Sequence, residues 1–151
     1  MTKWRGLIGI LFLALSFSCS GDRVFEEFYA FDSHSWHEKD TAVFMLNEMT
    51  EKTGQKLIGI KYSEEYPFSN CYIRVISSDT TGMVLDNVLI NVPLFNSKSG
   101  QPMGSGFGNT FTRYDTLPFE LSEQTSEVRF IQYMRQEHLP GLDAVGLKIL
   151  K

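Results

Sequence analysis

The stretch SEVRFIQYM, residues 126–134, is a clear indication of the fold class, because apolar and polar side chains alternate along it. Val128, Phe130 and Met134 occupy one row, and Arg129, Ile131 and Tyr133 occupy the other. A period of two residues is typical of a β-strand with one face against a core, since successive strand side chains point to opposite faces. The stretch therefore predicts a half-buried strand.

Similar runs recur along the chain, and no segment shows a convincing helical period. Three of them are clear: KLIGIKYS (56–63), VLDNVLINV (84–92) and AVGLKIL (144–150). A fourth alternating run is SNCYIRVIS (69–77), and three weaker candidates are 24–31, 41–47 and 109–121, the last interrupted by Pro118. Turn-forming residues separate them at Thr81-Gly82, at 96–109 and at Leu139-Pro140-Gly141. Seven or eight short strands without βαβ alternation predict an all-β fold, a single antiparallel β-sandwich of jelly-roll or immunoglobulin-like type.

The last two clear runs are separated by about nine residues that contain Pro140 and Gly141. Proline presets φ for the second position of a turn, and glycine accepts the positive φ that a type II turn requires at its third position. We therefore expect strands 126–134 and 144–150 to form a hairpin closed by this turn.

The N-terminal residues have the pattern of an export signal. Lys3 and Arg5 precede an apolar block of about twelve residues, 6–17, which is shorter than the roughly 20 residues of a spanning helix. Two interpretations remain. Cys19 directly follows the small residues and favours a lipoprotein signal over 1–18, with Cys19 lipidated as the first mature residue; alternatively, Ser16 and Ser18 serve a plain cleavage site.

Removal of residues 1–18 leaves 133 of the 151 residues, enough for one domain. We expect a lipid-anchored linker over 19–23 and the sandwich over 24–151. Loss of Lys3 and Arg5 reduces the 14 basic residues to 12 against 18 acidic residues, so the mature charge is near −6. Nucleic acid is therefore not an expected partner, since its binding depends on clustered Lys and Arg. The same charge disfavours attraction to anionic lipid, so membrane attachment is assigned to acyl chains on Cys19.

Cys71 is the second cysteine, and lipidation of Cys19 would leave it without a disulfide partner. In SNCYIRVIS it shares a row with Ile73 and Val75, which predicts a small buried residue on the core face of a strand. A catalytic thiolate needs a neighbouring base or cation, and the sequence identifies none.

The stretch HSWHEKD holds His34, Trp36, His37, Glu38 and Asp40, a set that includes metal-ligating types. Because the flanks read as loop and His138 is far away in the sequence, we interpret the stretch as a polar loop with Trp36 packed in the core. A metal site is the alternative.

The glycine-rich stretch GQPMGSGFGN, residues 100–109, lacks the lysine and the following helix of a phosphate loop. It predicts either a wide connection or a strand whose glycines allow close approach of another backbone. Residues 79–82 are predicted to form a turn, and Glu64-Glu65 are interpreted as carboxylates in a loop. The G-x-S-x-G motif that carries the nucleophile of serine hydrolases does not occur. We assign no catalytic, cofactor-binding or metal-binding residue, and we expect no enzyme activity.

Two stretches carry a resemblance to a known family: EYPFSNCYIRV (65–75) and QYMRQEHLPGLDAVGLKI (132–149). Together with Trp36 and the pair Gly104 and Gly106, and behind a lipoprotein signal, they resemble the GldH family of gliding-motility lipoproteins over nearly the whole mature chain. Cys71 and Met103 stand where leucine and tryptophan are expected for the family.

The resemblance implies a non-enzymatic envelope lipoprotein, anchored by lipid at the outer membrane. Its implied role is that of a scaffold or assembly factor of gliding machinery linked to type IX secretion, with other envelope lipoproteins or outer-membrane proteins as partners. The competing hypothesis is a carbohydrate-binding β-sandwich lipoprotein. An exposed line of three aromatic side chains would favour sugar binding, and an apolar patch with a polar rim would favour a protein partner.

Overall fold

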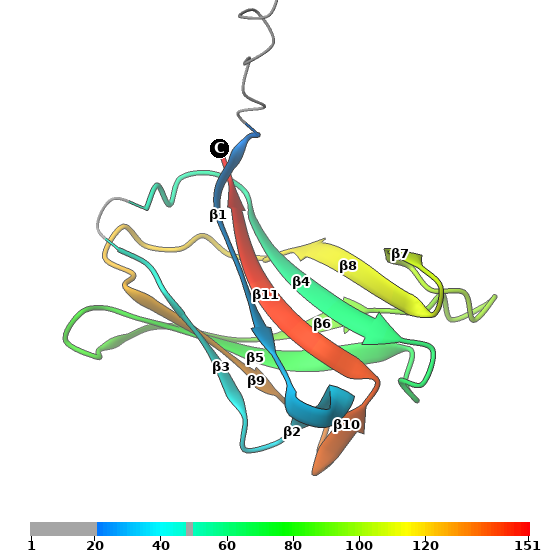
Figure 1. Cartoon of the computed structure of the whole chain (residues 1–151). Helices are drawn as coiled ribbons and strands as arrows, with labels where there is room; N and C mark the ends of the chain where they lie inside the picture. The colour runs from blue at the N-terminus through cyan, green and yellow to red at the C-terminus, as the bar shows by residue number, and fades with distance from the viewer. Residues whose placement is uncertain (1–20, 48–49) are drawn as a thin grey trace, which may run out of the picture.

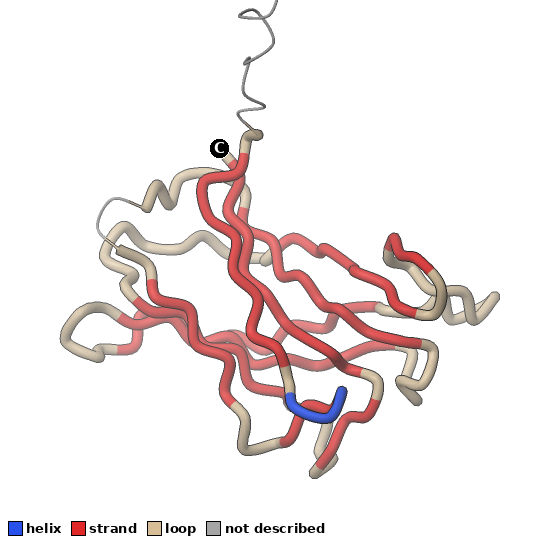
Figure 2. Tube along the Cα trace, in the orientation of Figure 1, coloured by secondary structure: helices blue, strands red, loops and turns tan. Residues whose placement is uncertain are grey.

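A computed structural model describes residues 21–47 and 50–151 and shows an almost entirely β-structured chain (Figures 1 and 2). The described chain contains eight long strands, three short strands and one 3-10 turn, η1 (Asp32–His34). The long strands are β1 (Arg23–Ala30), β3 (Thr41–Met45), β4 (Lys56–Ser63), β5 (Asn70–Ser78), β6 (Val84–Pro93), β8 (Thr110–Thr116), β9 (Glu127–Gln132) and β11 (Leu142–Leu150). The short ones are β2 (Ser35–His37), β7 (Ser105–Phe107) and β10 (His138–Pro140).

The strands form two main antiparallel sheets and a small ribbon. The larger sheet has the order β1-β11-β4-β8-β7, the smaller has the order β3-β9-β5-β6, and β10 pairs with β2 alone. Figure 1 shows the two sheets stacked, with β1, β11 and β4 crossing over β5 and β9. The predicted all-β antiparallel sandwich is confirmed.

The eight runs identified in the sequence all occur as long strands. The count of seven or eight was too low because it left out β2, β7 and β10, which have three residues each. A run this short contains too few residues to display a period of two, so its strand character depends on the partner strand.

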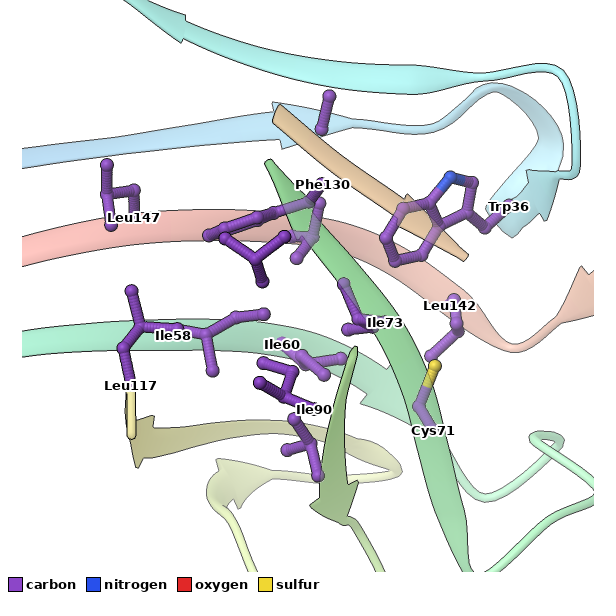
Figure 3. Packing of buried hydrophobic residues seen from close by; sticks show 14 of the residues in the cluster. Trp36, Ile58, Ile60, Cys71, Ile73, Ile90, Leu117, Phe130, Leu142 and Leu147 are labelled. Atoms are coloured by element: carbon purple, nitrogen blue, oxygen red, sulfur yellow. The ribbon is translucent and has the colours of Figure 1, made fainter. Parts of the chain in front are cut away.

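The core lies between the inner faces of the two sheets (Figure 3). Ile58, Ile60 and Leu147 come from the larger sheet and meet Ile73 and Phe130 from the smaller one, and all five are fully buried. At about 25 cal/mol per Å² of apolar surface, burial of these side chains is the main force that holds the sheets together.

The expected hairpin between the last two clear runs does not form. β9 pairs with β3 and β5 in the smaller sheet, whereas β11 pairs with β1 and β4 in the larger one. The connecting segment therefore crosses from one sheet to the other, and β10 lies within it. Gly141 does adopt the expected positive φ, at 80°. Two strands can each bury their apolar face against the same core from opposite sides. Their closeness in the sequence therefore did not determine whether they pair with each other.

The first and last described residues lie at one end of the larger sheet. Arg23 is opposite Leu150, and the Lys151 amide donates to the Asp22 carbonyl at 2.6 Å. The β2–β10 ribbon follows the other end of β1 (Figure 1), and eight strand residues span roughly 26 Å. Within the described part of the chain, no helix is long and apolar enough to cross a bilayer.

Candidate functional site

The β2–β10 ribbon changes the interpretation of the HSWHEKD stretch. Trp36 and Leu139 are opposite each other in the ribbon and fully buried, so their neighbours His37 and His138 point away from the core. His37 and His138 are also directly opposite, with ring centroids 4.5 Å apart and planes at 87°. The interpretation of His138 as isolated was wrong, and the loop interpretation of the stretch holds for residues 38–40 but not for Ser35–His37, because pairing with β10 was not visible in the sequence.

Trp36 is packed in the core as predicted. Its ring stacks on Phe31 at 4.6 Å between centroids, and its indole N–H donates to the Asp40 carbonyl at 2.8 Å. This hydrogen bond satisfies the one polar atom that burial of a tryptophan would otherwise leave without a partner.

The structure separates the two histidines of the stretch. Ser33 and His34 have positive φ values of 55° and 53°, and this turn directs His34 towards β11. There its Nδ1 lies 2.8 Å from an Asp143 carboxylate oxygen. His37 instead lies beside Glu137, with 3.7 Å between Nε2 and Oε1. The two therefore do not share a site.

Cys71 is a buried core residue, as predicted. It is fully buried and has no disulfide partner among the described residues. Burial raises the pKa of the Cys71 thiol to about 12, with an opposing contribution from the Tyr66 hydroxyl. The thiol is therefore protonated at neutral pH and unsuited to nucleophilic chemistry.

The glycine-rich stretch contains strand β7, which pairs with β8. A Cβ at Gly106 would lie 2.0 Å from the Thr110 carbonyl oxygen, and one at Gly104 would lie 2.6 Å from the Thr112 carbonyl oxygen. Both interpretations given above therefore hold for part of the stretch: residues 105–107 form a strand with close backbone approach, and residues 100–104 belong to the connection between β6 and β7.

Side-chain hydrogen bonds hold the predicted turn at residues 79–82 and a second turn before β5. The Asp79 carboxylate accepts from the Thr81 and Met83 amides at 2.8 and 3.0 Å, and Gly82 has φ 84°, so residues 79–82 form the expected turn. Tyr66 closes the turn before β5, because its hydroxyl donates to the Asn70 carbonyl at 2.9 Å.

One face of the molecule combines exposed aromatic, aliphatic and arginine side chains. It is the outer face of the smaller sheet, where residues alternate with the buried rows of β3, β9, β5 and β6. We call this the tyrosine–arginine face, and its members are Thr41, Val43, Met45, Tyr72, Arg74, Ile76, Leu85, Asn87, Leu89, Asn91, Glu127, Arg129, Ile131 and Tyr133.

Tyr72 and Tyr133 lie side by side on the tyrosine–arginine face, because the Tyr133 amide donates to the Tyr72 carbonyl at 2.8 Å. They are 41% and 45% exposed. The guanidinium carbon of Arg74 lies 4.5 Å from the centre of the Tyr133 ring. Such a cation–π contact holds both side chains in place without removing either from solvent.

The charge of this face differs from that of the chain. Its charged members are Arg74, Arg129 and Glu127, whereas the whole chain has a net charge of −4. Arg129 and Glu127 neutralise each other at 3.0 Å between Nε and Oε1, which leaves Arg74 as the excess charge. Protein interfaces are enriched in Tyr and Arg and depleted in Lys and Glu, and the tyrosine–arginine face has this composition.

The remaining exposed aromatic side chains of the described residues lie elsewhere. Tyr29 is on β1, and Phe107 is 96% exposed on β7, so both belong to the larger sheet. Tyr72 and Tyr133 are therefore a pair and do not extend to a line of three aromatic rings. The line of three exposed aromatic rings that would favour sugar binding is therefore not found among the described residues.

Comparison with known families decides the identity of the chain. The model of the GldH lipoprotein family matches residues 23–149. The chain belongs to the GldH lipoprotein family. The resemblance found in the sequence is thereby confirmed. The matched residues extend from the first residue of β1 to the penultimate residue of β11, so the whole sandwich is the GldH lipoprotein domain.

Membership makes this GldH lipoprotein a gliding-related protein that is held in the cell envelope by lipid. Cys19, the predicted lipidation residue, lies outside the described residues together with the predicted signal over 1–18. Searches of the curated proteins and of the solved structures give no match to the chain.

Proposed function

We propose that the protein is a non-enzymatic scaffold or assembly factor of the gliding machinery and of the type IX secretion linked to it. In this proposal, acyl chains on Cys19 anchor it in the outer membrane, and the tyrosine–arginine face binds another lipoprotein or outer-membrane protein of the machinery. The observation that carries the proposal is the composition of this face in a chain of the GldH lipoprotein family.

The partner surface is defined by what would complement this face. Tyr72, Tyr133 and Leu89 are exposed at 41%, 45% and 47% and offer an apolar centre. Arg74 supplies one uncompensated positive charge beside it. A matching surface would be apolar at its centre and would bring a carboxylate to Arg74, because a charge-assisted hydrogen bond fixes the orientation of two surfaces.

The anchor position is compatible with such binding. The described chain starts where β1 pairs with the end of β11, and Cys19 is four residues before Arg23 in the sequence. Four residues reach at most about 14 Å. The domain is therefore expected to lie close to its membrane, where envelope partners are confined to the same surface.

The test uses the full chain in a gliding host. The double variant Tyr72→Ala, Tyr133→Ala removes both rings and is compared with Tyr29→Ala, an exposed tyrosine of the larger sheet with 38% exposure. We expect the double variant to weaken partner binding by about 2 kcal/mol or more, as loss of buried aromatic anchors does. The measurements are chemical crosslinking in intact cells, spreading of colonies and secretion of a type IX substrate.

The expected result is loss of one crosslinked partner and of gliding in the double variant, with normal behaviour of Tyr29→Ala at equal protein levels. Normal crosslinking, gliding and secretion in the double variant would contradict a docking role for this face. Binding of the purified protein to envelope polysaccharide, abolished by the same double variant, would instead support the carbohydrate-binding alternative.

A further inference from the structure

Three potential metal ligands meet at the outer side of the β2–β10 ribbon. His37 and His138 occupy opposite positions, and Glu137 precedes His138. The Nε2 atoms of His37 and His138 lie 3.7 and 3.8 Å from the same Glu137 carboxylate oxygen. One ligand atom from each residue lies within 4.8 Å of the other two.

These donors have the chemistry of a transition-metal site. Two imidazole nitrogens and one carboxylate oxygen are a common set of protein ligands for Zn²⁺, which leaves the fourth tetrahedral position to water. With metal–ligand bonds of about 2.0–2.2 Å, tetrahedral ligand atoms are about 3.3–3.5 Å apart. The two histidine–carboxylate separations exceed this by a few tenths of an ångström, and the ligand atoms of the two histidines lie within 4.8 Å of each other. Glu137 is 71% exposed and free to rotate by that amount.

The geometry points to a surface site for a divalent transition-metal ion formed by His37, Glu137 and His138, with Zn²⁺ as the ion that fits the donors. This assignment differs from the expectation that the chain has no metal-binding residue. It is independent of the tyrosine–arginine face, which none of the three residues joins.

The backbone already holds the site together. The Glu38 amide donates to the Glu137 carbonyl at 2.9 Å, so the strand ends that carry the ligands are joined. Trp36 and Leu139 fix the register from below, because both are fully buried. The backbone positions of the two histidines are therefore fixed before any ion arrives, which lowers the entropic cost of binding.

A hydrogen bond to His37 predicts a proton relocation on metal binding. The Lys39 amide donates to His37 Nδ1 at 3.0 Å, so the neutral ring carries its proton on Nε2. Ligation through Nε2 requires that nitrogen to be unprotonated. The neutral ring then carries its one proton on Nδ1. The exposed Lys39 amide loses Nδ1 as its acceptor and donates a hydrogen bond to water instead. No net proton is gained or lost by the ring.

The first measurement is calorimetric titration of the full lipoprotein in detergent, without a polyhistidine tag and after chelator treatment, with zinc sulfate. We expect one ion per chain. The variants His37→Gln, His138→Gln and Glu137→Gln should each raise the dissociation constant at least about tenfold, since even outer-shell partners of metals contribute that much. His34→Gln is the matched control, because His34 contacts Asp143 outside the cluster and is 83% exposed.

The second measurement is the ¹⁵N NMR spectrum of the histidine rings and of the Lys39 amide. Zinc should convert His37 from the Nε2–H to the Nδ1–H tautomer and shift the Lys39 amide, with no change at His34. The melting temperature should rise with zinc in the parent and in His34→Gln, because an ion bound to the folded chain stabilises it. Absence of binding by the folded parent, or equal affinity of the parent and the three ligand variants, would overturn the assignment. An unchanged His37 tautomer on saturation would overturn it too.

Discussion

A Cβ atom on Gly141 would lie 2.5 Å from the backbone nitrogen of Tyr66. The backbone of the segment between β10 and β11 therefore approaches closely the turn that follows β4. Gly141 is also bonded on both sides, since its amide donates to the His34 carbonyl and its carbonyl accepts from the Ser63 amide, both at 2.9 Å. Three segments from distant parts of the sequence therefore meet at a position where a side chain does not fit.

Gly141→Val is expected to destabilise the domain by at least about 1–3 kcal/mol, because φ at this position is 80° and β-branched residues rarely adopt it. Gly100→Val is the control. Gly100 has φ 70° but no atom within 4 Å of an added Cβ, so it reports backbone strain alone. Urea unfolding of both variants measures the difference. Equal losses in the two would show that the contact with Tyr66 contributes nothing.

Cys71→Val is expected to cost less than about 1.5 kcal/mol, because it nearly conserves volume at a fully buried strand position. Cys71→Ser should cost more, since it places a hydroxyl group in an apolar core. Thiol titration of the native protein should show slow reaction of Cys71 until denaturant is added. Rapid labelling of the folded chain would contradict its burial.

Glu26 makes stability depend on pH. The Tyr114 hydroxyl donates to its carboxylate at 2.6 Å, and this bond, followed by the one from Arg23, lowers the pKa of Glu26. A lowered folded pKa contributes stability that is present above the ordinary glutamate pKa and is lost as pH falls through the folded value. Glu26→Gln should therefore cost about 1 kcal/mol at pH 7 and much less at pH 3.

Urea unfolding at the two pH values checks this, with Glu27→Gln as control. Glu27 is exposed on the same strand. A difference between parent and Glu26→Gln that is as large at pH 3 as at pH 7 would show that the charge of Glu26 is not the cause.

Cys19→Ala is expected to abolish incorporation of radiolabelled palmitate and to release the domain from the membrane or retain its precursor. The physical reason is that a negatively charged domain has no electrostatic attraction to anionic lipid, so the acyl chains alone provide attachment. Cys71→Ala serves as the control, because its buried thiol is not accessible for acylation. Equal label in Cys19→Ala and in the parent would contradict lipidation at this residue.

Much of the fold could be predicted from the sequence because strand formation by long amphipathic runs is a local property. The alternation in 126–134 placed Val128 and Phe130 in the core, and both are fully buried. Cys71 and Trp36 were assigned to the core for similar reasons, and the positive φ of Gly141 followed from turn chemistry. In each case the controlling information lies within a few neighbouring residues.

The tyrosine–arginine face could be predicted only in part from the sequence. The alternation in the sequence places Tyr72 and Tyr133 in the outer rows of their runs. Their adjacency, however, depends on the pairing of β5 with β9. A strand pattern specifies which face a side chain occupies and does not specify its cross-strand neighbour.

The all-β class, the eight long strands and the rows of side chains that these strands bury could all be predicted from the sequence, because those properties depend on local alternation. The placement of β9 and β11 in different sheets, and of His138 opposite His37, could not be predicted in this way. Strand pairing depends on contacts between residues far apart in the chain. Several pairings would bury the same apolar rows, and the packing of the complete core selects one of them.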